Sequence, residues 1–203
     1  GNIEVTANSI LLSGVDKRGY QSAISSSVLF ATGAGGDIRI NAQSLEVKEG
    51  ATIAGATVGQ GNGGTIEVNA ESVLVSGTKD GYQSELLTSS ASSGKAGDIR
   101  ITTNNLEVKD GGKIEASAYS SGSSGSIDVT ARNVVVSGVS EGELASIWAT
   151  GALGASGKGG FIRITTNNLE VKDGGRISVD TYGQGDAGSL IVAAKNILLD
   201  GGS

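Results

Sequence analysis

Residues 97–111 read G-D-I-R-I-T-T-N-N-L-E-V-K-D-G, and residues 160–174 repeat this string with a single change as G-F-I-R-I-T-T-N-N-L-E-V-K-D-G. Ile, Leu and Val occupy every second position in each half of the string, which is the period of a β-strand. β-branched residues dominate at these positions, as strands prefer. The small and polar residues between the halves indicate a corner. The string therefore predicts two short strands that meet at a corner.

The same motif recurs seven times along the chain, and each copy follows a glycine. These glycines are Gly1, Gly36, Gly64, Gly97, Gly125, Gly160 and Gly188. The steps between them are 35, 28, 33, 28, 35 and 28 residues, so long and short coils alternate. Fixed internal periods of this length are typical of solenoids.

A third, weaker strand is expected once in each coil. Its centres are Ile24, Ile53, Leu86, Ile114, Ile147 and Ile177. Three short strands per coil, with no helical period, predict an all-β fold: a right-handed parallel β-helix, or three-sided solenoid, of about seven coils. Residues 1–203 form a single repeat domain in this interpretation, and we expect them to be part of a longer chain because the pattern is already under way at Gly1.

Stacked coils would align equal positions in columns about 4.8 Å apart. Four columns, which begin at Ile3, Val5, Ile10 and Leu12, are apolar in every repeat, and we expect them to form the core. An outward column alternates acid with arginine, which predicts opposite charges on neighbouring coils. It consists of Glu4, Arg39, Glu67, Arg100, Asp128 and Arg163.

Composition narrows the possible chemistry. The chain has no Cys and no His, which removes thiolate metal sites and the most common general base. Its net charge of -6 argues against nucleic acid as a partner. No apolar run approaches the ~18 residues of a spanning helix, so no transmembrane segment is expected. We therefore expect no catalytic, cofactor-binding or metal-binding residues, and no enzyme.

Two series of acidic residues are the candidates that could contradict this expectation. Glu49, Asp110 and Asp173 each stand between a Lys and a Gly, which favours a repeated charged turn over a catalytic carboxylate pair. Asp37 and Asp98 stand in a Gly-rich string similar to calcium-binding repeats, but they recur only once per coil. Both series are interpreted as structural.

The motif also carries a family resemblance. Residues 35–50 read G-G-D-I-R-I-N-A-Q-S-L-E-V-K-E-G, and this string, with its two later copies, resembles the filamentous-haemagglutinin type of exoprotein, including cyanobacterial members. The resemblance extends over nearly the whole chain. It implies a secreted or outer-surface stalk, often adhesive, that is the passenger of two-partner secretion and leaves the cell through an outer-membrane partner transporter.

The long coils contain the least regular residues, in the extra segments 15–22, 78–84 and 139–145. An outward stripe beside them is aliphatic on long coils and Glu on short ones. We expect the segments either to fold over this stripe or to leave it as a contact face for cell-surface glycans or proteins. The candidate contact residues are Tyr20, Tyr82, Trp148, Leu11, Leu74 and Val135.

These observations predict a structural or adhesive shaft that displays the long-coil loops. The alternative is a carbohydrate-active β-helix enzyme or a polysaccharide-binding module, since several such proteins share the fold. Open strand edges at the ends of a solenoid further predict end-to-end self-association.

Overall fold

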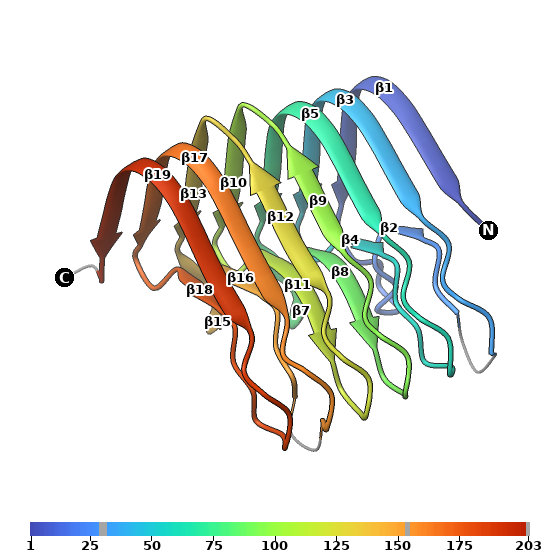
Figure 1. Cartoon of the computed structure of the whole chain (residues 1–203). Helices are drawn as coiled ribbons and strands as arrows, with labels where there is room; N and C mark the ends of the chain where they lie inside the picture. The colour runs from blue at the N-terminus through green and yellow to red at the C-terminus, as the bar shows by residue number, and fades with distance from the viewer. Residues whose placement is uncertain (29–31, 153–154, 202–203) are drawn as a thin grey trace.

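The computed structural model describes residues 1–28, 32–152 and 155–201, and it is a β-solenoid of stacked parallel strands (Figure 1). The described residues contain no helix, and thus none that is long and apolar enough to span a membrane. The solenoid has about six turns, roughly 29 residues apart. Each turn runs from one of the seven copies of the sequence motif to the next. The all-β solenoid predicted from the repeat is confirmed.

The first two sides of each coil lie in one nine-stranded sheet. In five coils a single strand turns the corner: β1 (Ile3–Ser13), β3 (Ile38–Lys48), β5 (Ile66–Ser76), β17 (Phe161–Lys172) and β19 (Ser189–Asp200). In the other two coils it divides at the corner into β9 (Ile99–Thr102) with β10 (Asn105–Lys109), and β12 (Ser126–Thr130) with β13 (Asn133–Ser137). Ile38 pairs with both Ile3 and Ile66, which reproduces the alternating long and short steps.

The third side is a six-stranded parallel sheet in the order β18-β16-β11-β8-β4-β2. Its strands are β2 (Ala23–Ser25), β4 (Thr52–Ala54), β8 (Glu85–Ser90), β11 (Lys113–Ala118), β16 (Ser146–Trp148) and β18 (Arg176–Ser178). The six expected centres, from Ile24 to Ile177, pair with one another in register. The predicted positions of the third strand are therefore confirmed.

The extra residues of the long coils form antiparallel hairpins. The second is β6 (Thr78–Lys79) with β7 (Tyr82–Gln83), the third is β14 (Val139–Ser140) with β15 (Glu143–Leu144), and a Val15–Gln21 bridge closes the first. At the second tip, Asp80 and Gly81 both have positive φ, of 54° and 80°. Two such residues in succession are the two-residue turn that suits the twist of a hairpin.

The core is a stack of aliphatic side chains. Ile38, Ile40, Leu45 and Val47 of one coil are fully buried, and their equivalents in the following coils lie above them. The glycine that begins each repeat allows the coils to approach closely: a Cβ on Gly125 would lie 1.8 Å from the carbonyl oxygen of Gly97. The motif thus specifies both what fills the interior and how tightly the coils stack.

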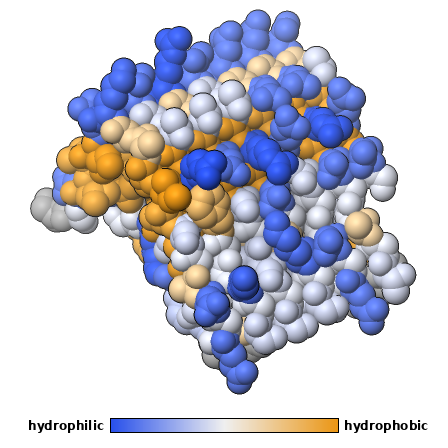
Figure 2. Space-filling view, viewed as in Figure 1, coloured by the Kyte–Doolittle hydropathy of each residue, from blue (hydrophilic) through white to orange (hydrophobic). Residues whose placement is uncertain are grey.

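The two ends of the solenoid are β1 and β19 (Figure 1). Apolar side chains of β19 are exposed, and Figure 2 shows them as an apolar area at that end. They are Leu190, Ile191, Ile197, Leu198 and Leu199. End-to-end association stays a prediction, which sedimentation of the chain over a range of concentrations would test.

The outward charged column lies in register, but its side chains pair less regularly than the alternation predicts. Arg39 reaches Glu67 on the next coil at 3.4 Å. Arg100 instead contacts Asp98 of its own coil, and the guanidinium of Arg163 lies 5.0 Å from the centre of the Phe161 ring. Exposed side chains have several partners within reach. The alternation in the sequence therefore places opposite charges on neighbouring coils, but not every two neighbours form an ion pair.

Candidate functional site

The first candidate surface is the hairpin ridge, which consists of residues 15–21, 78–83 and 139–144. Tyr20 and Tyr82 are exposed on it. Each of the first two hairpins is attached to the turn of the following short coil, because Gln21 Nε2 donates to the Gly50 carbonyl at 2.7 Å and Gln83 Nε2 donates to the Gly111 carbonyl at 2.8 Å. The string G-Y-Q-S, which occurs at residues 19–22 and again at 81–84, thus serves mainly to attach the hairpin to the solenoid.

The second and third hairpins also bind each other across the short coil between them. The hydroxyls of Thr78 and Ser140 share a hydrogen bond at 2.7 Å. The backbone N–H of Gly81 donates to Glu141 Oε2 at 3.0 Å. These contacts join residues about one two-coil unit apart, so the ridge is continuous between these two hairpins.

The aliphatic stripe beside the ridge stays partly open. Leu11 is 63% exposed, so the first hairpin does not cover it. Leu74 and Val135 are half-buried, and each stands in register between glutamates of the neighbouring short coils. A shallow pocket of about 180 Å³ lies along this stripe, between Leu74 and the glutamates Glu46 and Glu107. The stripe is therefore interrupted by charge and does not form a continuous apolar face.

The two acidic series occupy backbone positions that account for them. Glu49, Asp110 and Asp173 have φ of 50°, 50° and 51° and are followed by glycines, as in a tight turn. Asp37 Oδ1 accepts the Thr65 N–H at 3.0 Å, and Asp98 Oδ1 accepts the equivalent Ser126 N–H at 2.9 Å. In residues 1–28, 32–152 and 155–201 no group of three or more potential metal-binding side chains comes together.

The second candidate surface is the outer face of the six-stranded sheet, where the repeat is broken. Glu115 of β11 pairs in register with Trp148 of β16. Ala118 pairs with Gly151, and Gly151 pairs with Thr181. The residues one place further along are therefore Tyr119, Ala152 and Tyr182 on three consecutive coils. A small residue stands between two tyrosines.

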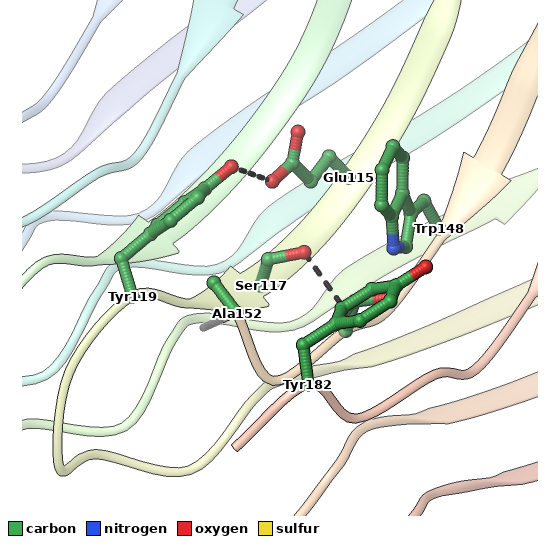
Figure 3. A pocket seen from close by; sticks show the side chains of 7 residues that line it. Glu115, Ser117, Tyr119, Trp148, Ala152 and Tyr182 are labelled. Atoms are coloured by element: carbon green, nitrogen blue, oxygen red, sulfur yellow. Dashed lines mark hydrogen bonds between the residues drawn. The ribbon is translucent and has the colours of Figure 1, made fainter. Parts of the chain in front are cut away.

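This arrangement leaves an open pocket of about 340 Å³. Figure 3 shows Tyr119 and Trp148 on either side of Ser117, with Tyr182 close to Trp148. Ser117 and Thr150 lie in the row between the large side chains and are almost completely buried. The small side chains of Ser117, Thr150 and Ala152 leave the pocket open, and three aromatic side chains surround it.

A buried charged cluster supports one wall of the pocket. Lys113 Nζ lies 2.9 Å from Glu115 Oε2 and 3.3 Å from Glu85 Oε2, and the Tyr119 hydroxyl donates to Glu115 Oε1. Burial raises the pKa of Glu85, an effect that Lys113 opposes. Burial lowers the pKa of Lys113, but the carboxylates of Glu115 and Glu85 outweigh it and hold that pKa above its ordinary value. The cluster thus places one ammonium group, that of Lys113, between the carboxyl groups of Glu85 and Glu115.

The tyrosine and the indole complete this wall. Burial and the neighbouring Glu115 raise the pKa of Tyr119, so its hydroxyl stays protonated and remains a donor. Trp148 Nε1 is the one buried polar side-chain atom of the described residues that has no hydrogen-bond partner. On the other side of Trp148, a second pocket of about 260 Å³ reaches the third hairpin at Leu144 and contains Arg176, which pairs with Asp180 at 2.7 Å.

Sequence reasoning identified Trp148 but missed Glu115, Tyr119 and Tyr182. The prediction used the outward-facing residues of the first two strands of each coil, but only the inward-facing residues of the third strand. The missing signal is visible once the third strand is aligned by its centres, because one outward column then reads Val58, Ala91, Tyr119, Ala152 and Tyr182. Large aromatic residues appear there only on the later coils.

Comparison with protein-family models, with curated proteins and with solved structures gives no match. The function of the protein is therefore inferred from the geometry of the chain.

Proposed function

We propose that the chain is a shaft segment of a secreted or outer-surface exoprotein of the filamentous-haemagglutinin type, exported through an outer-membrane partner transporter. The observation that carries this proposal is the unbroken register of the coils, from Ile3–Ile38 at one end to Ile162–Leu190 at the other. A stack held by parallel pairing on three sides bends only if that pairing breaks. Six steps of strand spacing give a rigid rise of about 29 Å.

The hairpin ridge is the proposed adhesive element of this shaft. Its tips are polar and exposed and include Tyr20 and Tyr82, while the hairpins themselves are bonded to the body of the solenoid. Loops on one face of a solenoid are a common place for partner contact. The partners that suit exposed tyrosines and mixed charges are cell-surface glycans or proteins.

The shaft role is tested by lengthening the chain. Residues 64–124 comprise one long and one short coil, and a duplicate of them inserted after residue 124 keeps the register. Small-angle scattering should show a rod lengthened by about 10 Å with an unchanged cross-section. A compact particle, or loss of cooperative unfolding in the longer chain, would contradict a rigid shaft.

The adhesive role is tested separately with a fluorescently labelled chain on whole cells and glycan arrays. The double variant Tyr20→Ala, Tyr82→Ala should lose surface binding while retaining its fold. Val58→Ala, an exposed residue on another face, is the matched control. If the double variant still binds to surfaces, the proposed adhesive role of the ridge is wrong and only the shaft role remains.

The carbohydrate-active alternative draws its support from the aromatic pocket beside two carboxylates. Glu115 is 3% exposed, however, and both of its oxygens are bonded, to Lys113 and to Tyr119. A general acid or base must reach the bond it cleaves. Release of reducing ends from any polysaccharide, abolished by Glu115→Gln, would reverse this ranking.

A further inference from the structure

The pocket between Tyr119, Trp148 and Tyr182 requires its own explanation, because nothing in a shaft depends on it. It lies on three consecutive coils, and its equivalents on earlier coils are small or aliphatic residues such as Val58 and Ala91. Tyr119 and Tyr182 are separated by two strand spacings, about 9.6 Å. Ala152 stands between them and fills none of that space.

The walls of the pocket offer aromatic surface and few free polar groups. The Tyr119 hydroxyl is engaged with Glu115. Ser117 Oγ accepts the Thr150 N–H at 3.2 Å, and Thr150 Oγ1 accepts the Asp180 N–H at 3.4 Å. A ligand that needs many hydrogen bonds would find most of these groups already used.

The carboxyl groups beside the pocket outnumber the basic groups that contact them. Among the described residues, Lys113 is the one cation within ion-pair distance of Glu85 and Glu115. Arg176, on the other side of Trp148, is already paired with Asp180. Two carboxyl groups therefore share one ammonium group next to the three aromatic side chains.

We propose that this pocket binds a quaternary ammonium group, the trimethylated cation found in choline. Such a cation has no N–H to satisfy, is apolar at its surface, and is attracted to the faces of Trp and Tyr rings and to a nearby carboxylate. Tyr119, Trp148 and Tyr182 present such rings, and the buried carboxyl group of Glu115, bonded to Lys113 and Tyr119, lies in the wall beside them. The volume of about 340 Å³ is at the small end of the range for ligand pockets and suits such a headgroup.

Two other occupants fit the pocket less well. A saccharide stacks on aromatic rings but also needs donors and acceptors for its hydroxyls, and the hydroxyl oxygens of Ser117 and Thr150 already accept backbone N–H groups. A proline-rich peptide fits an aromatic groove but carries no charge to offset the cluster. The proposal does not depend on the shaft role, since the pocket would bind the same cation in a chain with no adhesive function.

Trp148 provides the measurement, because it is the only tryptophan of the chain and lines the pocket. Titration of the whole chain with choline or tetramethylammonium should change its fluorescence saturably, with a dissociation constant on the order of 1 mM. The neutral tert-butyl analogue of choline, which has the same shape without the charge, should bind at least about fivefold more weakly. Equal binding of the neutral analogue, or no saturable response to either cation, would overturn the proposal.

Variants locate the response in the pocket. Tyr119→Ala and Tyr182→Ala should each weaken choline binding about fivefold or more, because each removes one ring from the cation. Ala152→Leu, which fills the gap between the tyrosines, should abolish binding with the rings in place. Val58→Ala, in the same column on an earlier coil, should bind as the natural chain does. Circular dichroism separates a blocked pocket from a chain that has not folded.

A final set of titrations distinguishes the sources of the cation. Phosphatidylcholine vesicles present it as a lipid headgroup, and a peptide with a trimethylated lysine presents it as a modified side chain. Binding of either one supports the proposal and identifies the source. Binding of neutral oligosaccharides or of a proline-rich peptide, without binding of choline, would refute it.

Discussion

The hairpin ridge and the aromatic pocket are built in opposite ways, although a second pocket connects them between Leu144 and Trp148. The ridge repeats in every long coil, and its polar side chains bond to the backbone of the neighbouring coil, as Gln21 and Gln83 do. The pocket occurs once, and its polar side chains bond mainly to one another around Lys113. In a solenoid, a repeated residue usually serves the stacking of coils, so a departure from the repeat is the better guide to a ligand.

The largest expected effect concerns the stacking itself. Gly125→Ala would place a Cβ 1.8 Å from the Gly97 carbonyl oxygen, and the other nearest atoms are also backbone, which cannot move aside as a flexible side chain can. We expect a loss of about 4 kcal/mol in the free energy of unfolding, measured by chemical denaturation. Gly81→Ala at a hairpin tip, where a Cβ meets nothing within 4 Å, should cost only the about 1 to 2 kcal/mol of its positive φ. Similar losses in the two variants would show that close approach of the coils is not the reason for the repeated glycine.

The next effect concerns the charged cluster under the pocket. Lys113→Met leaves Glu85 and Glu115 buried without their cation and should cost about 3 kcal/mol at neutral pH. Because the folded-state pKa of Glu85 is raised, its favourable contribution is present below its ordinary pKa of 4.5 and is lost as the pH rises through the folded-state pKa. The deficit of the variant should therefore shrink in acid.

The control for this variant is Lys109→Met, which breaks a repeated pair with Glu107 on the surface. Both side chains are more than a third exposed, at 37% and 41%, so the loss should stay below about 1 kcal/mol. Denaturation of both variants across a range of pH measures the contrast. A pH-independent deficit in Lys113→Met would show that lost packing, and not unpaired charge, is the cause.

A smaller effect tests how the hairpins dock. Gln83→Leu removes the hydrogen bond to the Gly111 carbonyl and introduces the residue that the third hairpin has at this place, Leu144. We expect a loss of about 1 kcal/mol in unfolding free energy. The same substitution at the exposed Gln60 should be neutral. No difference between the two would mean that the Gln–carbonyl bond does not hold the ridge in place.

The smallest effect concerns the Asp that bonds to the next coil. Burial acts to raise the pKa of Asp98, but hydrogen bonds from Lys95 and from the Ser126 N–H, with the charges of Lys95 and Arg100, hold it below 3.8. A carboxyl group whose pKa is lower in the folded state than in the unfolded state stabilises the fold at pH values above its unfolded-state pKa. This stabilisation is lost as the pH falls through the folded-state pKa.

Asp98→Asn keeps an acceptor for Ser126 but loses the charge, so it should cost less than about 1 kcal/mol at neutral pH and nothing well below pH 3.8. Lys95→Met should reproduce most of this difference, because Lys95 Nζ lies 3.0 Å from Asp98. Thermal unfolding at several pH values measures both variants. A deficit that persists in strong acid would assign Asp98 a role independent of its charge.

Much of the fold could be predicted from the chain alone. Each core column has the same chemistry in every coil, and a slip of one residue would turn it outward, so repetition specifies both the strands and their register. The third-strand centres from Ile24 to Ile177 followed from the same reasoning. The hairpins were expected as protruding segments, but not as antiparallel pairs docked on short-coil turns, because the docking uses backbone groups that the sequence does not display.

The sequence by itself therefore determined the alternating coils of the solenoid, since the inward residues repeat and the glycines between them leave no room for a side chain. Only the tertiary structure decided where the pocket lies. Its residues differ from coil to coil and are about 30 residues apart along the chain, and the hollow depends on small neighbours such as Ala152 standing between large ones. A pattern that repeats is visible along the chain, whereas a site made of unlike residues appears only when the coils are stacked.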